Sequence, residues 1–288
     1  MKKIVIEMLR RLEPIYGKGE TLAMIHEIFR VLKGWDTTEY TIRLADDYQL
    51  SDYMQQKIAD ILSRLEKHEP LQYILGTADF YGFNVHVEPG VLIPRPETEE
   101  LVRQIVNENK ASDLKVADLG TGSGAIALAL SRYLNFPEID AIDISPKAVE
   151  VAEGNKKALK CNNITVRQGD MTHWNPDPES YDIIVSNPPY VDDSERDSMA
   201  ENVKDYEPSL ALFVPDADPL KFYRAIVPEA KEALKQGGKL YFEINPRHAD
   251  EMQALMKNAG FRNVNVWRDS QGLNRFIEGR KPMQDDWQ

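Results

Sequence analysis

The residues after position 114 alternate between short apolar runs and longer segments in which apolar residues recur at helical spacing. The short runs predict buried strands at 115–119, 139–143, 164–168, 181–185 and 239–244, and two closing strands at 264–267 and 274–277. The longer segments predict helices at 125–134, 146–160, 220–234 and 252–260, with Gly237 and Gly238 expected to stop the third. Strands that alternate with helices form a parallel sheet covered on both faces, so we predict an α/β fold.

The first 75 residues have a different pattern, because their apolar residues form three stripes at helical spacing. The second stripe ends at Gly34, and Ser51 is a suitable N-cap for the third. A shorter helical segment is expected around 40–44. We interpret residues 1–75 as a small all-helical domain that docks a partner or closes over a ligand.

The segment that follows contains signals for a hairpin and a stiff connection. Aromatic and β-branched residues at 80–87 predict a β-hairpin. Pro94 and Pro96 then impose an extended backbone, and Pro96 is suited to open a helix. Arg95 is held between them, and it could contact a carboxylate of a ligand or pair with Glu97; both interpretations stay open.

The composition excludes several classes of protein. The chain has 288 residues, 42% hydrophobic and 28% charged, which is typical of a soluble globular protein. It has no apolar run of about 18 residues that could span a membrane. A single cysteine and the lack of a signal-peptide core indicate a reducing cytoplasm. The net charge of −12 argues against duplex nucleic acid as a partner, and the five histidines lack metal-ligand spacing, so no metal is expected.

The sequence Asn187-Pro188-Pro189-Tyr190 follows the fourth predicted strand. The strand has to stop there, because proline has no N–H to donate to a sheet, and two consecutive prolines make the turn stiff. In open α/β sheets, this edge is where ligands bind. We call residues 187–190 the Asn-Pro-Pro-Tyr turn. A simple strand-terminating turn is the alternative interpretation.

The turn offers two acceptors, the Asn187 side-chain oxygen and the Pro188 carbonyl, to one planar NH2 group, and Tyr190 could cover the face of that group. Accepting hydrogen bonds from both hydrogens directs the nitrogen lone pair and favours a more pyramidal nitrogen. This is catalysis by positioning and directed electrostatics, and it needs no strong base.

A glycine-rich loop at 120–124 follows the first predicted strand. It fits the loose dinucleotide-binding fingerprint, and Asp143 has nearly the spacing of a ribose-binding acid in that fold. Asp118, at the strand end before the glycines, would however repel a pyrophosphate and attract a ligand that carries an ammonium and a sulfonium. S-adenosylmethionine carries both charges and no phosphate, so we predict it as the cofactor and S-adenosylhomocysteine as its product.

Each predicted cofactor contact has a chemical reason. The glycines let the backbone approach the methionine part of the ligand, and Asp143 can accept from both ribose hydroxyls. Asp170 can accept from the adenine amine, with Met171 against the ring. Asp118 and Asp143 could also be ordinary turn residues at strand ends. The predicted cofactor-binding set is Asp118, Gly120, Thr121, Gly122, Ser123, Gly124, Asp143, Asp170, Met171 and Asn187.

With these residues in place, the chain resembles the peptide chain release factor glutamine N5-methyltransferases over nearly its whole length. The stretches that carry the resemblance are 72–76, 80–82, 92–101, 118–124 and 187–190, with further similarity at 206–208 and 242–244. Two stretches depart from the family pattern, 214–218 and 245–248.

The resemblance implies a Rossmann-like, seven-stranded methyltransferase sheet at 96–288, a β-hairpin linker at 76–95 and a helical substrate-docking domain at 1–75. It implies methylation of the side-chain amide nitrogen (N5) of the glutamine in the Gly-Gly-Gln motif of release factors. We expect a cytoplasmic monomer without direct contact to nucleic acid or membrane. The predicted catalytic residues are Asn187, Pro188 and Tyr190, and the predicted substrate-binding residues are Asn187, Pro188, Pro189, Tyr190 and Arg95.

Three alternatives stay open. The same turn would suit a methyltransferase acting on the amino group of a nucleic-acid base, adenine N6 or guanine N2. A non-catalytic nucleotide-binding protein would retain the cofactor without transferring a methyl group. A dehydrogenase would bind a nicotinamide cofactor, which Asp118 should disfavour.

Overall fold

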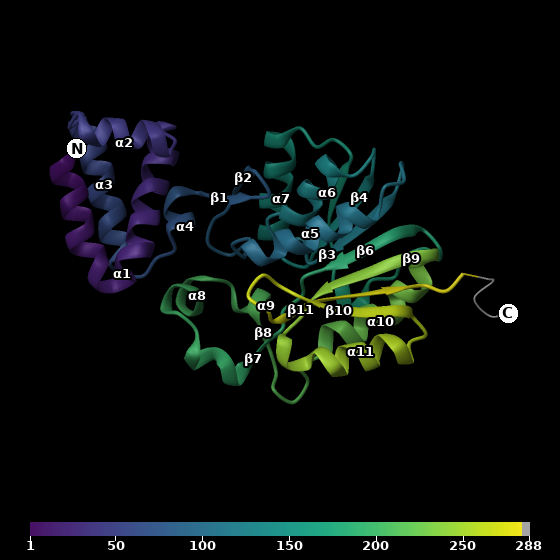
Figure 1. Cartoon of the computed structure of the whole chain (residues 1–288). Helices are drawn as coiled ribbons and strands as arrows, with labels where there is room; N and C mark the ends of the chain where they lie inside the picture. Colours follow the sequence, from purple (N-terminus) through teal and green to yellow (C-terminus); the bar gives the residue numbers. More distant parts are fainter. Residues whose placement is uncertain (284–288) are drawn as a thin grey trace. The chain divides into compact units, whose positions relative to one another are not determined.

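The computed structural model describes residues 1–283 and divides the chain into two compact units. The first contains Met1–Thr77 and Ala200–Tyr206, and the second contains Ala78–Met199 and the chain from Glu207 onward (Figure 1). None of the helices in the described part of the chain combines the length and apolar character needed to cross a membrane.

The first unit is helical. Its helices are α1 (Lys2–Lys33), α2 (Thr37–Ala45), α3 (Asp52–Leu65), α4 (Leu71–Leu75) and α8 (Glu201–Tyr206). The two N-terminal stripes lie in α1, which breaks at Gly17, where φ is 75° and ψ is 163°. Gly34 ends α1 in a left-handed conformation, and Ser51 caps α3 by accepting from Met54 N, as the sequence predicted. The apolar faces of α1, α2, α3 and α4 share one core that includes Leu12, Phe29 and Leu65.

The second unit is built on a seven-stranded sheet. Its strands are β3 (Lys115–Leu119), β4 (Glu138–Asp143), β5 (Ile164–Gln168), β6 (Tyr181–Ser186), β9 (Leu234–Glu243), β10 (Arg262–Arg268) and β11 (Asn274–Arg280). The order across the sheet is β10-β11-β9-β6-β3-β4-β5. All seven predicted strands are confirmed.

The prediction of a parallel sheet is wrong for one strand, β11, which pairs antiparallel with both β9 and β10. The chain between β10 and β11 is only five residues long, and so short a connection can join antiparallel strands but not parallel ones.

Helices and short elements surround the sheet (Figure 1). The helices are α5 (Pro96–Glu108), α6 (Ala125–Tyr133), α7 (Pro146–Leu159), α9 (Ser209–Leu212), α10 (Lys221–Ala233) and α11 (Ala249–Asn258). The short strands form two pairs, β1 (Thr77–Phe80) with β2 (Phe83–His86), and β7 (Val191–Asp192) with β8 (Phe213–Val214). Three 3-10 turns complete the unit: η1 (Met171–His173), η2 (Asp193–Ser198) and η3 (Pro246–His248). The predicted hairpin, the start of α5 at Pro96 and the Ser145 cap of α7 are confirmed.

The expectation that Gly237 and Gly238 stop a helix is wrong, because α10 ends before Leu234 and both glycines lie inside β9. A side chain at Gly238 would approach the backbone oxygens of Lys235 and Asp182 to 2.9 and 3.1 Å. This glycine therefore allows close packing of β9 against the start of the neighbouring strand β6.

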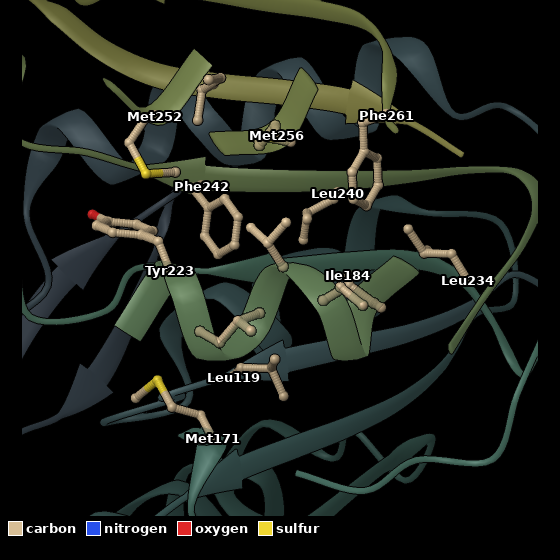
Figure 2. Close-up of a cluster of buried hydrophobic side chains, with 14 of the residues drawn as sticks. Leu119, Met171, Ile184, Tyr223, Leu234, Leu240, Phe242, Met252, Met256 and Phe261 are labelled. Atoms are coloured by element: carbon tan, nitrogen blue, oxygen red, sulfur yellow. The ribbon is translucent and has the colours of Figure 1, made fainter. Parts of the chain in front are cut away.

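One apolar core lies between the sheet and helices α10 and α11 (Figure 2). The labelled side chains come from β3, β6, β9, α10, α11 and the chain around them: Leu119, Met171, Ile184, Tyr223, Leu234, Leu240, Phe242, Met252, Met256 and Phe261. Tyr223 is buried in this core, and its hydroxyl donates to the backbone oxygen of Glu243 at 2.9 Å. That bond fixes the last residue of β9, which lies beside the candidate site.

Candidate active site

The carboxyl ends of three parallel strands meet at one edge of the sheet. In the register of the sheet, Leu119 at the end of β3 pairs with Ile142 of β4 and with Ser186 of β6. The residues that come next in each strand or loop are Gly120, Asp143 and Asn187. The parallel register therefore brings the glycine-rich loop, the expected ribose-binding acid and the Asn-Pro-Pro-Tyr turn side by side.

A cavity lies at this edge, and its empty space, open mouth included, is about 910 Å³. The predicted residues that line it are Arg95, Gly120, Thr121, Gly122, Ser123, Asp143, Met171, Asn187 and Pro189. The predicted residues that are not among its lining are Asp118, Gly124, Asp170, Pro188 and Tyr190. The sequence missed several lining residues, among them Phe80, Leu92, Thr98, Pro208 and Leu210.

The glycine-rich loop turns tightly over the end of β3. Gly120, Gly122 and Gly124 all have positive φ angles, of 76°, 56° and 84°. The N–H groups of Gly120 and Thr121 both donate to the backbone oxygen of Ile142, at 2.8 and 3.0 Å. The loop is thereby fixed to β4, and its bare glycine backbone faces the cavity.

Asp118 is fully buried beneath this loop. Its Oδ2 accepts from Thr121 Oγ1 at 2.7 Å and from Ala127 N at 3.2 Å, so it holds the loop to the start of α6. Within the described part of the chain, Oδ1 has no hydrogen-bond partner. Burial raises the pKa of Asp118 to about 7, although the bonds from Thr121 and Ala127 act in the opposite direction.

Asp143 lines the cavity at the end of β4. Its two oxygens accept from Gly122 N at 2.8 Å and from Ser145 N at 2.9 Å. Burial raises its pKa, and these backbone bonds oppose the effect. Each carboxylate oxygen can accept a second hydrogen bond, so the acid can hold the loop and still receive a ligand's hydroxyls.

Asp170 has a local role in the structure. Its Oδ1 accepts from the backbone N and the hydroxyl of Thr172, at 2.8 and 2.7 Å, and His173 Nδ1 lies 3.1 Å from Oδ2. The hydroxyl of Thr172, followed by other bonds, lowers the pKa of Asp170. The neighbouring Met171 does line the cavity, and its Cε would lie 3.0 Å from a Cβ added at Gly120.

The Asn-Pro-Pro-Tyr turn begins directly after β6. Asn187 is half-buried and lines the cavity with Pro189, whereas Pro188 is buried. The Tyr190 hydroxyl donates to Glu243 Oε1 at 2.9 Å, and Asn245 Nδ2 donates to the backbone oxygen of Tyr190 at 3.0 Å. Tyr190 is thus held from both its ends, and burial, followed by the charge of Glu243, raises the pKa of its hydroxyl.

The partner of Arg95 is Glu207, so of the two interpretations left open by the sequence, the pairing with Glu97 is wrong. Arg95 Nη2 lies 2.6 Å from Glu207 Oε1, and Ile93 N donates to Glu207 Oε2 at 3.1 Å. The sequence separation of 112 residues hid this partner. Arg95 also lines the cavity.

The chemistry of the lining residues fits S-adenosylmethionine. The loop presents glycine backbone where a Cβ would crowd Met171, and Asp143 supplies carboxylate oxygens beside it. Among the lining residues, Arg95 is the one cation, and it is already paired with Glu207, which is unlike a phosphate site.

Comparison with family models matches two parts of the chain. Residues 110–286 match the model described as a methyltransferase domain. Residues 10–76 match the model described as the PrmC N-terminal domain.

Several curated relatives are similar over almost the entire chain. A protein of Bacteroides thetaiotaomicron named release factor glutamine methyltransferase is 42% identical over 281 residues, which cover 98% of this chain and 100% of the relative. Proteins of the same name from Flavobacterium psychrophilum and Streptococcus pneumoniae are each 39% identical. These alignments cover 96% and 92% of this chain, and 98% and 94% of the relatives.

Proposed function

This chain belongs to the family of release factor glutamine methyltransferases, and we propose that its Asn-Pro-Pro-Tyr turn holds the release-factor glutamine during methyl transfer. The protein is an S-adenosylmethionine-dependent methyltransferase with a Rossmann-like fold. Its product is a release factor methylated on a glutamine side-chain amide, and we assign the reaction to the N5 nitrogen of the Gly-Gly-Gln motif.

The residues around the glycine-rich loop are proposed to hold the cofactor. When bound, S-adenosylmethionine supplies an electrophilic methyl group. The backbone of the loop accommodates the methionine part, Asp143 accepts from the ribose hydroxyls, and Met171 contacts the adenine. Asp118 acts from beneath, by fixing the loop through Thr121 and Ala127. We propose that Asp170 supports the site without contacting the cofactor, because its carboxylate already accepts a hydrogen bond from the backbone of Thr172.

Asn187 and Pro188 are proposed to orient the substrate amide. An amide nitrogen is a poor nucleophile because its lone pair is delocalised into the carbonyl. The Asn187 Oδ1 and the Pro188 backbone oxygen accept from its two hydrogens, which directs the lone pair and favours pyramidal geometry at nitrogen. Pro189 and Tyr190 keep the turn in place. The proton released after transfer goes to solvent, so no strong base is needed.

We further propose that residues 1–75 form a substrate-docking domain and that 76–95 connect it to the catalytic domain at 96–288. A release factor is the protein partner, and Arg95 at the cavity could meet a carboxylate of it. We propose a cytoplasmic monomer that makes no direct contact with nucleic acid or membrane.

The observation that carries this proposal is the position of Asn187, which follows β6 at the edge where the glycine-rich loop and Asp143 line the same cavity. The test is mass analysis of the Gly-Gly-Gln peptide of a purified release factor after incubation with the enzyme and labelled S-adenosylmethionine. We expect one added methyl group on the glutamine. Label in bulk nucleic acid instead would favour a base amino methyltransferase, and cofactor binding without any transfer would favour a regulatory protein.

The residue-level test compares Asn187→Ala with Asn162→Ala, a change at an exposed asparagine of the same unit. Asn187→Ala should retain cofactor binding and lower turnover by about 10²–10³, the cost of losing one preorganised hydrogen-bond partner at a reaction centre. Asn162→Ala should behave like the wild type. Normal turnover in Asn187→Ala would refute the role of the turn.

A further inference from the structure

A buried carboxylate connects both ends of the Asn-Pro-Pro-Tyr turn. Glu243, the last residue of β9, is 1% exposed and accepts at both oxygens. Thr98 Oγ1, from the first turn of α5, donates to Oε2 at 2.7 Å, and the Tyr190 hydroxyl donates to Oε1 at 2.9 Å. On the far side of Thr98, Asn187 Nδ2 lies 3.4 Å from the same hydroxyl oxygen. The four side chains form a line from Tyr190 through Glu243 and Thr98 to Asn187.

The chemistry of the four groups determines which of them donates and which accepts in each hydrogen bond. Thr98 Oγ1 donates to Glu243 Oε2, so the single hydrogen of the Thr98 hydroxyl points to Glu243. The Thr98 oxygen then presents lone pairs to Asn187. Of the two ends of the Asn187 carboxamide, only the NH2 can satisfy those lone pairs, and the carbonyl oxygen has to point away from Thr98.

We propose that Glu243, acting through Thr98, is a positioning residue that fixes which end of the Asn187 carboxamide meets the substrate. The proposal rests on the function assigned above, in which Asn187 has to offer an acceptor to the substrate NH2. If the carboxamide turned over, its own NH2 would face the substrate NH2, and two donors would meet. We call this line of four side chains, from Tyr190 through Glu243 and Thr98 to Asn187, the relay. The relay therefore determines which hydrogen-bonding group of Asn187 faces the substrate, while the prolines determine the shape of the turn.

The surroundings hold Glu243 firmly in this position. Its backbone oxygen accepts from the fully buried Tyr223 hydroxyl at 2.9 Å. Burial raises the pKa of Glu243, and the hydrogen bonds from Thr98 and Tyr190 and the charge of Arg275 oppose the rise. Thr98 is 4% exposed and also lines the cavity, so little water competes for the hydroxyl.

Glu243→Gln tests the direction of the relay. The Tyr190 hydroxyl continues to need an acceptor on its side, so the new carboxamide keeps its oxygen towards Tyr190 and turns its NH2 towards Thr98. The Thr98 hydroxyl then accepts from Gln and donates towards Asn187, which draws the Asn187 oxygen away from the substrate. We expect kcat for a full-length release factor to fall by about 10²–10³, as for the loss of one acceptor, with the Kd for S-adenosylmethionine unchanged.

Thr98→Val separates this reversal from simple damage. Valine has a similar shape and no hydroxyl, so Asn187 loses its orienting partner without being forced into the wrong orientation. We expect a milder fall in kcat, about tenfold, the value of one neutral hydrogen bond. Thr98→Ser keeps the hydroxyl and should lose less than Thr98→Val.

The decisive variant is the double change of Glu243→Gln with Thr98→Val in the full-length enzyme. Because valine cannot pass on the reversed polarity, the double variant should recover the activity of Thr98→Val and exceed that of Glu243→Gln. A merely structural role for Glu243 predicts the opposite, a double variant at least as impaired as Glu243→Gln, and that result would overturn the proposal. Wild-type activity in Glu243→Gln would overturn it as well.

Failure of the proposed function is distinguishable from failure of the relay. A wild-type enzyme that leaves the release-factor glutamine unmethylated would refute the function itself. An active wild type with unaltered variants would refute only the relay. If Glu243→Gln does not fold, which a thermal melt detects, the comparison of Thr98→Val with Thr98→Ser decides, and equal kcat in those two variants would refute the relay.

Discussion

Arg95 and Glu207 form an ion pair of 2.6 Å, which joins the chain just before α5 to the chain just before α9. The pair is asymmetric in burial, since the side chain of Glu207 is 1% exposed and that of Arg95 is 30% exposed. Glu207 also accepts from Ile93 N, so this carboxylate organises two stretches of the cavity wall at once.

The burial of Glu207 predicts unequal costs for changing the two partners. Arg95→Ala leaves a buried carboxylate with one backbone donor, and we expect the free energy of unfolding to fall by about 3 kcal/mol. Glu207→Gln keeps an acceptor for Ile93 N and should cost about 1 kcal/mol. Urea unfolding measures both, and Lys157→Ala, which breaks an exposed pair with Glu153, is the control at about 0.5 kcal/mol or less. Equal losses for Arg95→Ala and Lys157→Ala would contradict this account.

A comparison of Gly120, in the glycine-rich loop, with Gly272, outside it, separates the effect of backbone conformation from the effect on cofactor binding. Both have left-handed φ angles, 76° and 85°, so alanine should cost about 1–2 kcal/mol of stability at either position. A Cβ at Gly120 would also lie 3.0 Å from Met171 Cε inside the cavity wall, whereas nothing lies within 4 Å at Gly272.

We therefore expect Gly120→Ala, and not Gly272→Ala, to weaken S-adenosylmethionine binding by about tenfold or more, which corresponds to about 1.4 kcal/mol. Isothermal titration calorimetry on both variants gives the comparison. Unchanged affinity in Gly120→Ala would show that the loop does not approach the cofactor.

Local signals in the sequence were enough to locate the seven strands of the sheet and the main helices. The caps at Ser51 and Ser145, the proline that opens α5 and the apolar runs of all seven strands act over a few residues, and each is confirmed. The two errors concern pairing across the fold. The antiparallel direction of β11 follows from the five-residue connection after β10, and Gly238 is explained by the backbone of Lys235 together with that of Asp182, which is distant in sequence.

The same distinction applies to the candidate site. Motif residues such as Asp143 and Asn187 line the cavity, because the loops that carry them begin at strand ends whose position the alternation predicts. The groups that support them were not predictable. Glu243 is 145 residues from Thr98, and Glu207 is 112 residues from Arg95, so nothing in either local sequence indicates that the two would meet.

Asp143 is expected to be the residue on which cofactor affinity depends most. It accepts from Gly122 N and Ser145 N, and asparagine has only one acceptor oxygen, so Asp143→Asn leaves one backbone donor unpaired and removes the charge that strengthens bonds to ribose hydroxyls. We expect the Kd for S-adenosylmethionine to rise by about 10- to 100-fold. The control is Glu138→Gln, an exposed change in the same strand. Similar affinities for the two variants, measured by calorimetry, would argue against a role for Asp143 in binding.

The burial of Asp118 predicts a defined dependence of stability on pH. Burial raises the pKa of this carboxyl to about 7, against about 3.9 in an unfolded chain. Between these values the native state binds more protons than the unfolded state, so the contribution of Asp118 to stability is full below about pH 4 and is lost as the pH rises to about 7. An asparagine cannot titrate, and it keeps an acceptor for Thr121 and Ala127.

The measurement is the difference in unfolding free energy between the wild type and Asp118→Asn, determined with urea at about pH 5 and about pH 8. We expect the difference to shift by about 2–3 kcal/mol in favour of the variant at the higher pH. Burial raises the pKa of Glu278 to about 7 as well, but Glu278 is present in both proteins and its titration cancels in the difference. If the two proteins show parallel stability profiles, Asp118 is ionised throughout this range, and its unpaired Oδ1 then requires a bound water or cation even without cofactor.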